Sequence, residues 1–507
     1  MNGNDALREL RERLAEIHDL SAAGGLLGWD QQTMMPERGG ALRAEQLSTI
    51  GRLAHERFTD DRIGELLSSL EGEEERLRAA DPDSDDAALI RVTRRDWEKA
   101  RRVPDDLVAE LARAEATGFQ AWVEARQASD FGQFLPYLER NVELKRRYID
   151  CFADFEDPYD ILLDDFEEGM RTAEVARLFA ELRAELVPLI AAVAEHADRV
   201  DNSILSGDFD VERQRTLVRG VVEQLGWRPD GWRLDEAAHP FATSFGPSDV
   251  RLTTRYDPGY IGMALYGSIH EFGHGLYESQ IAPELARTPL GEGVSLGVHE
   301  SQSRMWENIV GRGRPFATWL HGRAADVFPE RFGDVDPEDF YRAVNRVQPS
   351  LIRVEADEAT YSLHIILRFE LEREMIDGTI ALKDLPEAWN ARMKDYLGVD
   401  VPNDAQGVMQ DVHWAAGSIG YFSTYALGNL IGAQLWQRAR ADLPNLDAAL
   451  AEGNGQPLRG WLGEHLHRYG RKRTPRETVE RITGAPLQVG PFVEYLQGKL
   501  TALYGLS

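Results

Sequence analysis

The chain carries two histidines, His270 and His274, four residues apart, with Glu271 directly after the first. On a helix this spacing places both imidazoles on one face, so that they can bind one metal ion. Glu271 is then placed to act as general base toward a water rather than as a ligand, the pattern of zinc peptidases. Glu300, after a gap of 25 residues, completes a His2Glu ligand set with an open fourth position, which is typical of hydrolytic zinc. The alternative is a chance match within an ordinary helix.

Helical periodicity dominates the segments that must position these side chains. Leu7, Leu10, Leu14 and Ile17 recur at three- and four-residue spacing, and 175–197, 106–125 and 360–378 follow similar patterns. No internal repeat or low-complexity linker interrupts them. The sequence therefore predicts one predominantly α-helical unit over residues 1–507.

One segment, 239–257, has the pattern of a strand instead. Apolar or β-branched residues alternate with arginines and threonines from Val250 to Tyr256, and we expect a small sheet formed with 241–245. Asp257-Pro258 then predicts the start of the helix that carries the histidines, with aspartate as cap and proline in the first turn. The glycines of this helix, Gly273 among them, indicate close approach of neighbouring backbone.

Composition limits the partners and the compartment. The net charge of −29 argues against nucleic acid, because a phosphate backbone needs a cationic surface. The single cysteine, Cys151, excludes an intramolecular disulfide and a thiolate zinc site. The residues from Met1 onward lack the pattern of a signal peptide, and no long apolar run occurs, so we expect a soluble cytoplasmic protein without membrane partners. The 86 acidic residues and only six lysines fit either adaptation to concentrated salt or arginine-favouring codon usage.

Several further motifs together resemble the carboxypeptidase Taq (M32) metallocarboxypeptidases over nearly the whole chain. They occur in the family's order and comprise 29–33, His239-Pro240-Phe241, 249–253, 270–274 with 299–303, 352–357 and 407–414. The resemblance implies an all-α, gluzincin-like fold with a long substrate groove and a small sheet near the active site. It also implies a homodimer, dependence on zinc or cobalt, and broad release of C-terminal residues from peptides, with C-terminal proline resisted.

The same resemblance suggests how substrate is held. Arg353 is the candidate for the free C-terminal carboxylate, because a guanidinium binds a carboxylate through two parallel hydrogen bonds. The alternative is an ordinary salt bridge from Arg353 to Glu355 or Asp357. The strand at 250–256 is expected to hold the substrate backbone by strand addition. His239, Asp249 and Arg251 are assigned to substrate binding in this groove, although an internal ion pair between the last two is the competing interpretation.

The segment 413–425 supplies candidates for stabilising the oxyanion. In related gluzincins a histidine and a tyrosine in such a glycine-containing segment donate hydrogen bonds to the tetrahedral oxyanion, which points to His413 and to Tyr421 or Tyr425. Core packing is the alternative for all three.

The remaining histidines receive simpler roles. His364 is expected in the core with its hydrogen bonds satisfied, and His465 and His467 in solvent. His299 adjoins a ligand and is expected to support it.

Two rival functions remain open from the sequence. One is a related helical metallo-oligoendopeptidase or dipeptidase, which would not require a free C-terminal carboxylate. The other is a non-catalytic protein in which zinc joins two helices, although such a site has no use for Glu271.

Overall fold

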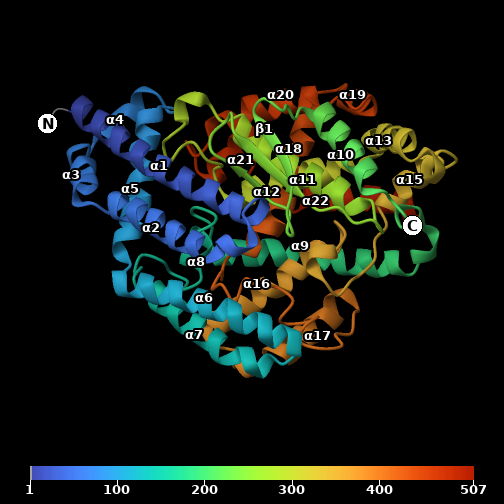
Figure 1. Ribbon diagram of the computed structural model, residues 1–507, viewed down its shortest axis with the longest axis horizontal. Coiled ribbons are helices and arrows are strands. Elements are labelled where there is room, and N and C mark those ends of the chain that lie inside the picture. Colours follow the sequence, from blue (N-terminus) through green and yellow to red (C-terminus); the bar gives the residue numbers. More distant parts are fainter. Residues whose placement is uncertain (1–2, 507) are drawn as a thin grey trace.

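The computed structural model describes residues 3–506, while Met1, Asn2 and Ser507 lie outside the described residues. Helices dominate the fold, and the small sheet lies in the middle of the chain, as the sequence predicts (Figure 1). The helices before the sheet are α1 Gly3–Thr33, α2 Gly40–Phe58, α3 Asp61–Ser69, α4 Glu73–Ala80, α5 Asp85–Arg102, α6 Asp105–Ala128, α7 Phe131–Ile149, α8 Asp160–Asp164, α9 Thr172–Ala194 and α10 Val211–Leu225. Those after it are α11 Gly262–Ser279, α12 Leu296–Arg304, α13 Arg314–Val327, α14 Pro329–Phe332, α15 Pro337–Val344, α16 Tyr361–Asp377, α17 Leu385–Leu397, α18 Ser423–Asp442, α19 Leu446–Ala451, α20 Gln456–His465, α21 Pro475–Thr483 and α22 Gly490–Tyr504.

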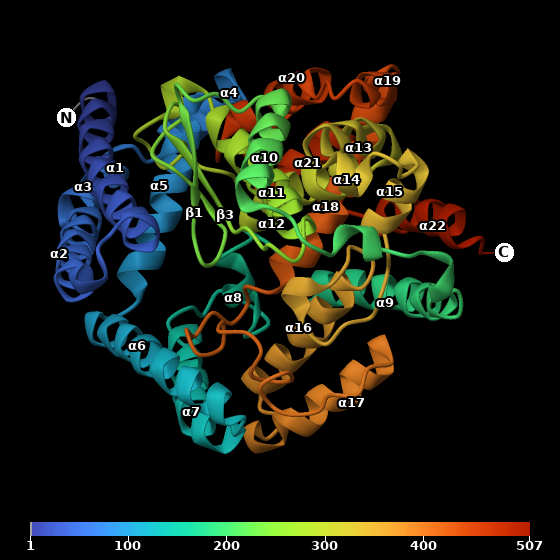
Figure 2. The same cartoon turned by 45° about the vertical axis from the view of Figure 1, so that its right-hand side comes forward.

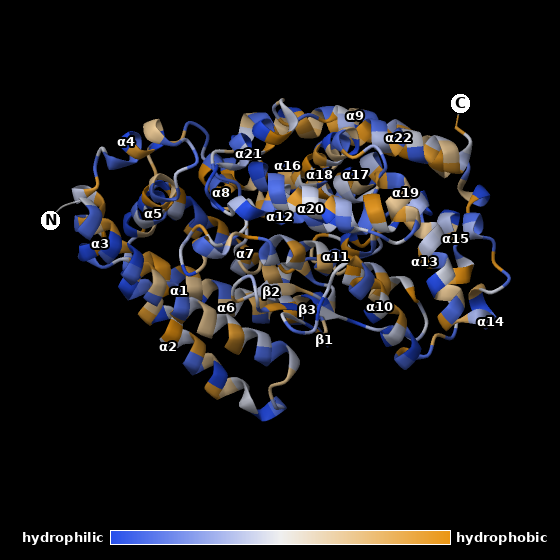
Figure 3. Ribbon diagram, turned by 90° about the horizontal axis from the view of Figure 1, so that it is seen from above, coloured by the Kyte–Doolittle hydropathy of each residue, from blue (hydrophilic) through white to orange (hydrophobic). Residues whose placement is uncertain are grey.

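The N-terminal helices α1 and α2 form an antiparallel hairpin at one edge of the molecule (Figures 1 and 3). An ion pair between Asp30 and Arg43, with 2.7 Å between Oδ2 and a terminal nitrogen, joins the two helices. The lower part of the molecule consists of α6, α7, α16 and α17, and α11, α12 and α18 lie above them (Figure 2). Within residues 3–506, none of the helices combines the length and apolar character needed to cross a membrane.

The sheet has the strand order β1-β3-β2, with β1 at Trp232–Glu236, β2 at Ala242–Ser244 and β3 at Val250–Thr254. The predicted strand and its partner are confirmed, since β2 pairs with β3 antiparallel, Ala242 opposite Leu252. The sequence missed β1, which pairs with β3 in parallel. Because β3 is hydrogen-bonded on both sides, it has no open edge, and the expectation that it holds substrate by strand addition is wrong.

The helix that carries the histidines also begins later than predicted. It starts at Gly262 rather than at Asp257-Pro258. The Asp257 carboxylate instead accepts the backbone N–H of Gly259 at 2.7 Å, so it closes a local turn. The side chain of Asp257 therefore does not cap α11, and the intervening residues form the turn that leads from β3 into the helix.

Candidate active site

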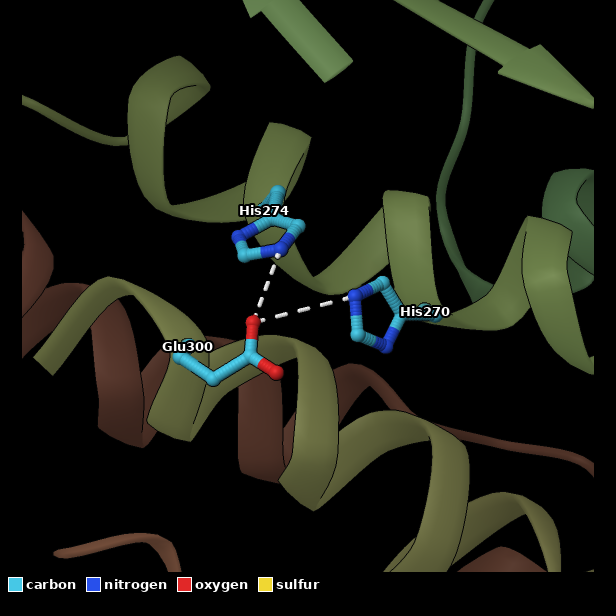
Figure 4. A group of neighbouring side chains, drawn as sticks. All are labelled: His270, His274 and Glu300. Carbon is cyan, nitrogen blue, oxygen red and sulfur yellow. Dashed lines mark ion pairs between the residues drawn. The ribbon is translucent and has the colours of Figure 1, made fainter. Parts of the chain in front are cut away.

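The three predicted metal ligands lie close together, on two neighbouring helices (Figure 4). His270 and His274 project from α11, and Glu300 faces them from α12. Glu300 Oε2 lies 3.8 Å from His270 Nε2 and 3.4 Å from His274 Nε2. Within residues 3–506 this is the group of histidine, cysteine and carboxylate side chains with the spacing of a metal site.

Glycines allow the helices that carry these ligands to approach closely. A Cβ at Gly273 would lie 2.5 Å from the carbonyl oxygen of Gln302 and 2.6 Å from Ser303 Cα, both on α12. A Cβ at Gly428 on α18 would lie 2.8 Å from Glu300 Cβ. Since such distances are too short for real contacts, a larger residue would separate the ligand helices. The close approach predicted for Gly273 is thus present.

The ligand spacing fits a tetrahedral zinc ion. Zinc binds histidine nitrogen and carboxylate oxygen at about 2.0–2.2 Å, which places ligand atoms roughly 3.3–3.6 Å apart in a tetrahedron. The two separations from Glu300 lie at or close to this range. Three protein ligands leave one coordination position for water or substrate.

A carboxylate orients the first histidine ligand. His270 Nδ1 lies 2.8 Å from Glu307 Oε2, so Nε2 is directed toward the metal position. Glu307 lies in a π-helical segment, Met305–Gly311, that directly continues α12. Glu307 Oε1 pairs with Arg312 at 2.8 Å, and the guanidinium of Arg304 lies 3.5 Å from Oε2, the oxygen that contacts His270.

The second histidine ligand has a different partner. His274 Nδ1 lies 2.6 Å from His299 Nδ1, and His299 Nε2 lies 2.7 Å from Glu278 Oε1. One histidine must donate and the other accept, and a donor at His299 Nε2 facing Glu278 leaves His299 Nδ1 as the acceptor. His299 therefore supports a ligand, as the sequence suggested, and Glu278 is the partner that the sequence did not identify.

Glu271 lies beside the ligands with one oxygen that has no partner. Its side chain is buried, and Oε2 has no hydrogen-bond partner among the described residues. Burial raises the pKa of Glu271 to about 7, with the negative charge of Glu300 adding to the rise and His270 opposing it. Glu300 is different, because its Oε1 accepts Arg304 Nε at 2.7 Å. The Glu300 carboxylate is thus paired with a cation, whereas Glu271 has a carboxylate oxygen without a hydrogen-bond partner.

We use the name metal pocket for the three ligands together with Glu271, Glu278, Glu307, Arg304 and Arg312.

His413, Tyr421 and Tyr425 form an aromatic group at the start of α18. Tyr425 Oη lies 3.5 Å from His413 Nε2, and the ring centroids of the two tyrosines are 5.4 Å apart. Burial lowers the pKa of His413 to about 4, so its imidazole is neutral near pH 7. Burial raises the pKa of both tyrosines, and Arg353 Cζ lies 5.0 Å from the ring centroid of Tyr425.

Arg353 is buried, and its salt bridge is not to either residue that the alternative interpretation named. Its Nε and one terminal nitrogen donate to Asp411 Oδ1 at 3.0 and 2.7 Å, and the other terminal nitrogen donates to Tyr361 Oη at 2.8 Å. Arg368, which is fully buried, donates to Asp411 Oδ2 at 2.8 and 2.5 Å. We call Arg353, Arg368 and Asp411 the arginine cluster.

A short chain of contacts connects the arginine cluster to the metal pocket. Arg304, which binds Glu300, lies over the ring of Tyr361 at 4.0 Å from the centroid. The hydroxyl of Tyr361 accepts from Arg353. A metal ligand and a candidate carboxylate anchor are therefore separated by only two side chains.

The other predicted substrate-binding residues lie around the sheet. Asp249 and Arg251 form an ion pair with two contacts of 2.9 Å, as the alternative interpretation expected. The guanidinium of Arg251 also lies 4.4 Å from the ring centroid of Trp29 and 5.0 Å from that of Phe245. His239 is exposed in the turn that follows β1. A role for these three residues in a groove stays a prediction.

Two of the minor histidine assignments require correction. His467 is fully buried, not solvated, and its nitrogens lie 2.6 Å from Gln280 Oε1 and 2.8 Å from Gln302 Oε1. His364 is in the core as expected, but neither ring nitrogen forms a well-aligned hydrogen bond among the described residues, and the polar group that the imidazole approaches is the backbone of Ser350. His465 is partly exposed.

Sequence reasoning missed the residues that hold the site rather than form it. Glu307 is seven residues after Glu300 and could have been found from helical spacing. Asp411 lies inside a motif already singled out, two residues before His413. Arg368 carried no signal, since nothing in its local sequence distinguishes it from other helical arginines.

Comparison with known proteins identifies a single family. The family model described as carboxypeptidase Taq (M32) metallopeptidase matches residues 9–500. Thermostable carboxypeptidase 1 of Thermus thermophilus is 44% identical, covering 100% of both chains, and carboxypeptidase 1 of Bacillus subtilis is 39% identical, covering 98% of each. Among solved structures, an M32 carboxypeptidase from Deinococcus radiodurans has a TM-score of 0.94 at 43% identity, covering 99% of this chain and 100% of that one. Metallocarboxypeptidase 1 of Trypanosoma cruzi has a TM-score of 0.92 at 31% identity, covering 98% and 99%.

Proposed function

The chain belongs to the carboxypeptidase Taq (M32) family and is a metallocarboxypeptidase, and we propose that it uses zinc, with cobalt as a substitute, to release C-terminal residues from peptides. The observation that carries the proposal is the His270, His274 and Glu300 cluster with the unpartnered carboxylate of Glu271 beside it. We further propose broad specificity with C-terminal proline resisted, as the family resemblance implies.

Glu271 is the general base in the proposed mechanism. His270, His274 and Glu300 would hold zinc, which would act there as a Lewis acid toward water and the scissile carbonyl. The unpartnered Oε2 of Glu271 accepts the proton of the attacking water and passes it to the departing amine. Because this oxygen is buried and has no hydrogen-bond partner among the described residues, no other donor competes with the attacking water for it.

His413, with Tyr421 or Tyr425, stabilises the oxyanion. A tyrosine hydroxyl donates to an anionic oxygen without carrying a charge of its own. The long contact from Tyr425 to His413 is weak, so little is lost when Tyr425 turns toward substrate. Such donors contribute roughly 3–4 kcal/mol to transition-state stabilisation.

Arg353 binds the free C-terminal carboxylate and so makes the enzyme an exopeptidase. Three of its five N–H groups bind Asp411 and Tyr361, which leaves two for the substrate. Upstream residues of the peptide would lie toward an open cavity of about 480 Å³ lined in part by Lys99 and Tyr148. Both side chains contact Asp165, and the ring of the next residue, Phe166, lies 5.1 Å from that of Tyr421. His239, Asp249 and Arg251 are proposed to border the groove.

We propose that the protein works as a cytoplasmic homodimer and as one catalytic unit spanning residues 1–507. One large cluster of buried apolar side chains, from Ala6 to Tyr504, supports the single unit. The family resemblance supports the dimer and the lone cysteine fits a reducing compartment. The net charge of −29 favours peptides over nucleic acids as partners.

The decisive experiment is timed mass spectrometry of a free-acid peptide and its C-terminal amide. Metal-free enzyme should be inactive, and added zinc or cobalt should restore stepwise shortening of the free acid only. Equal cleavage of both peptides would identify an oligoendopeptidase instead. Full activity without metal, checked by elemental analysis, would overturn the metal assignment, and bound zinc without any hydrolysis would indicate a structural site.

A further inference from the structure

The arginine cluster contains one more positive charge than its ion pairs neutralise. Asp411 uses both carboxylate oxygens, Oδ1 for Arg353 and Oδ2 for Arg368. The cluster thus holds two guanidiniums and one carboxylate, all buried or nearly so. Uncompensated charge in such a place is costly unless a ligand of opposite sign completes the set.

A further buried carboxylate, Glu372, lies one helical turn from Arg368 but pairs with neither arginine, because it accepts hydrogen bonds from Tyr159, Trp414 and the backbone of Gly420. The nearby histidines add no charge to the cluster. Burial lowers the pKa of His364 to about 3 and that of His413 to about 4, so both imidazoles are neutral near pH 7. Burial lowers the pKa of Arg368 to about 10, which still leaves it cationic at that pH. The aromatic rings of Trp389 and Phe422 cover the guanidinium of Arg368, at 4.4 and 5.3 Å from its Cζ. Among the described residues, Asp411 is therefore the one carboxylate that forms an ion pair with either guanidinium of the cluster.

The two arginines differ in their access to substrate. Arg368 has no exposed side-chain surface, and its remaining terminal nitrogen donates to the backbone oxygen of His364 at 2.6 Å. Arg353 keeps two N–H groups without a partner among the described residues. Only Arg353 is placed to touch a ligand.

We propose that Arg368 is a positioning residue for carboxylate recognition: by sharing Asp411 it keeps the Arg353 site cationic and holds its guanidinium fork in place. Without Arg368, Arg353 and Asp411 form a neutral pair with little attraction for a second carboxylate. This inference rests on the proposed function of Arg353 and adds a residue that never contacts substrate.

The test compares the inhibition constant of 3-phenylpropionate with the KM and kcat of one blocked dipeptide in zinc-loaded enzyme. Arg368→Met should raise both the inhibition constant and KM by about tenfold or more, with a smaller change in kcat, because the lost interaction acts on carboxylate binding. Arg368→Lys keeps the charge and should stay closer to the parent enzyme.

The double variant Arg368→Met with Asp411→Asn separates charge from structure. It removes one cation and one anion, so Arg353 again carries uncompensated charge, and carboxylate binding should recover relative to Arg368→Met alone. A purely structural role predicts that the double variant is at least as impaired as the single one. That result would overturn the proposal, as would an inhibition constant for Arg368→Met within about twofold of the parent value.

Two controls keep the outcomes distinct. Arg146→Met removes an exposed arginine that binds only backbone oxygens at the end of α16, and it should leave the inhibition constant unchanged. Arg353→Ala tests the anchor itself: if it leaves carboxylate binding intact, the anchor assigned under the proposed function fails. If Arg353→Ala weakens binding and Arg368→Met does not, only the present inference fails. Should Arg368→Met not fold, loss of carboxylate binding in a folded Arg368→Lys would overturn the charge argument.

Discussion

The metal pocket and the arginine cluster are two buried charged regions of opposite sign. In the metal pocket, carboxylates outnumber guanidiniums, since it contains two arginines, Arg304 and Arg312, and four glutamates, Glu271, Glu278, Glu300 and Glu307. In the arginine cluster, two guanidiniums share one carboxylate. Each region is incomplete by itself, and the sign of its excess matches the ligand proposed for it: a divalent cation in one, a carboxylate in the other. For buried ion pairs, the net charge that remains unpaired therefore indicates the ligand better than the number of pairs does.

The largest expected effect is on kcat, and it distinguishes the general base Glu271 from the proposed metal ligands of the metal pocket. Glu271→Gln should lower kcat by about 10²–10⁴-fold, because general-base assistance is lost while the ligands remain. Metal content, measured by elemental analysis, should stay at the parent level. The matched control His270→Ala should lose both metal and activity. Loss of zinc in Glu271→Gln would show that Glu271 is a ligand, which the geometry does not predict.

The next largest effect is expected for a substitution in the arginine cluster. Arg353→Ala should lower kcat/KM for free-acid peptides by about 2–5 kcal/mol equivalent, since it removes one partner of a buried charge pair. KM should rise while metal content is unaffected, which distinguishes this change from damage to the metal pocket. Steady-state kinetics with a free-acid peptide measure it. Unimpaired cleavage would mean that another residue holds the carboxylate.

The supporting carboxylates give a smaller effect. Glu307→Gln keeps a hydrogen-bonding side chain beside His270 but removes a charge, and it should weaken metal affinity by about 10–100-fold. Competition with a chelator measures this change directly. Glu338→Gln provides the control, because Glu338 is an exposed partner of Arg314 on the surface. Equal affinity in both variants would contradict a role for Glu307 in holding the ligand.

Glu372 is a buried carboxylate outside both regions, and it tests whether a buried charge without an ion-pair partner affects stability. Glu372 accepts hydrogen bonds from Tyr159, Trp414 and the backbone of Gly420, all neutral donors, and burial raises its pKa to about 7. Between the ordinary value of 4.5 and about 7, the folded state holds more protons than the unfolded state. The free energy of unfolding should therefore fall as pH rises through this window and then level off.

Urea unfolding between pH 4.5 and 8 measures that dependence, with Glu372→Gln as the comparison. The variant should lose this part of the pH dependence whatever its absolute stability. An identical pH dependence in both proteins would show that Glu372 is ionised throughout, held by its three donors.

The smallest effect concerns the surface rather than either buried region. If the acidic surface is an adaptation to salt, screening in molar KCl, where the Debye length is about 3 Å, should relieve repulsion and raise the melting temperature. The buried clusters are screened far less. A melting temperature that does not change from dilute to molar KCl would favour codon usage as the origin of the composition.

The helical fold class and the common face of His270 and His274 could be predicted from the sequence because both depend on local spacing. The four-residue spacing of His270 and His274 gives them a common face on any helix, whatever surrounds it. The periodic segments and the alternating strand at 250–254 likewise follow from backbone geometry. The wrong start of α11 has the same origin: Asp257-Pro258 also suits a turn, and local sequence did not distinguish the two outcomes.

Only the tertiary structure decided which charges share a site. The partners of Arg353, the burial of His467 and the central position of β3 all depend on segments far apart in the chain. A sequence gives the number of charges but not their neighbours, and Coulomb interactions depend on distance and burial. The imbalance that distinguishes the metal pocket from the arginine cluster therefore exists only once α11, α12, α16 and α18 are packed.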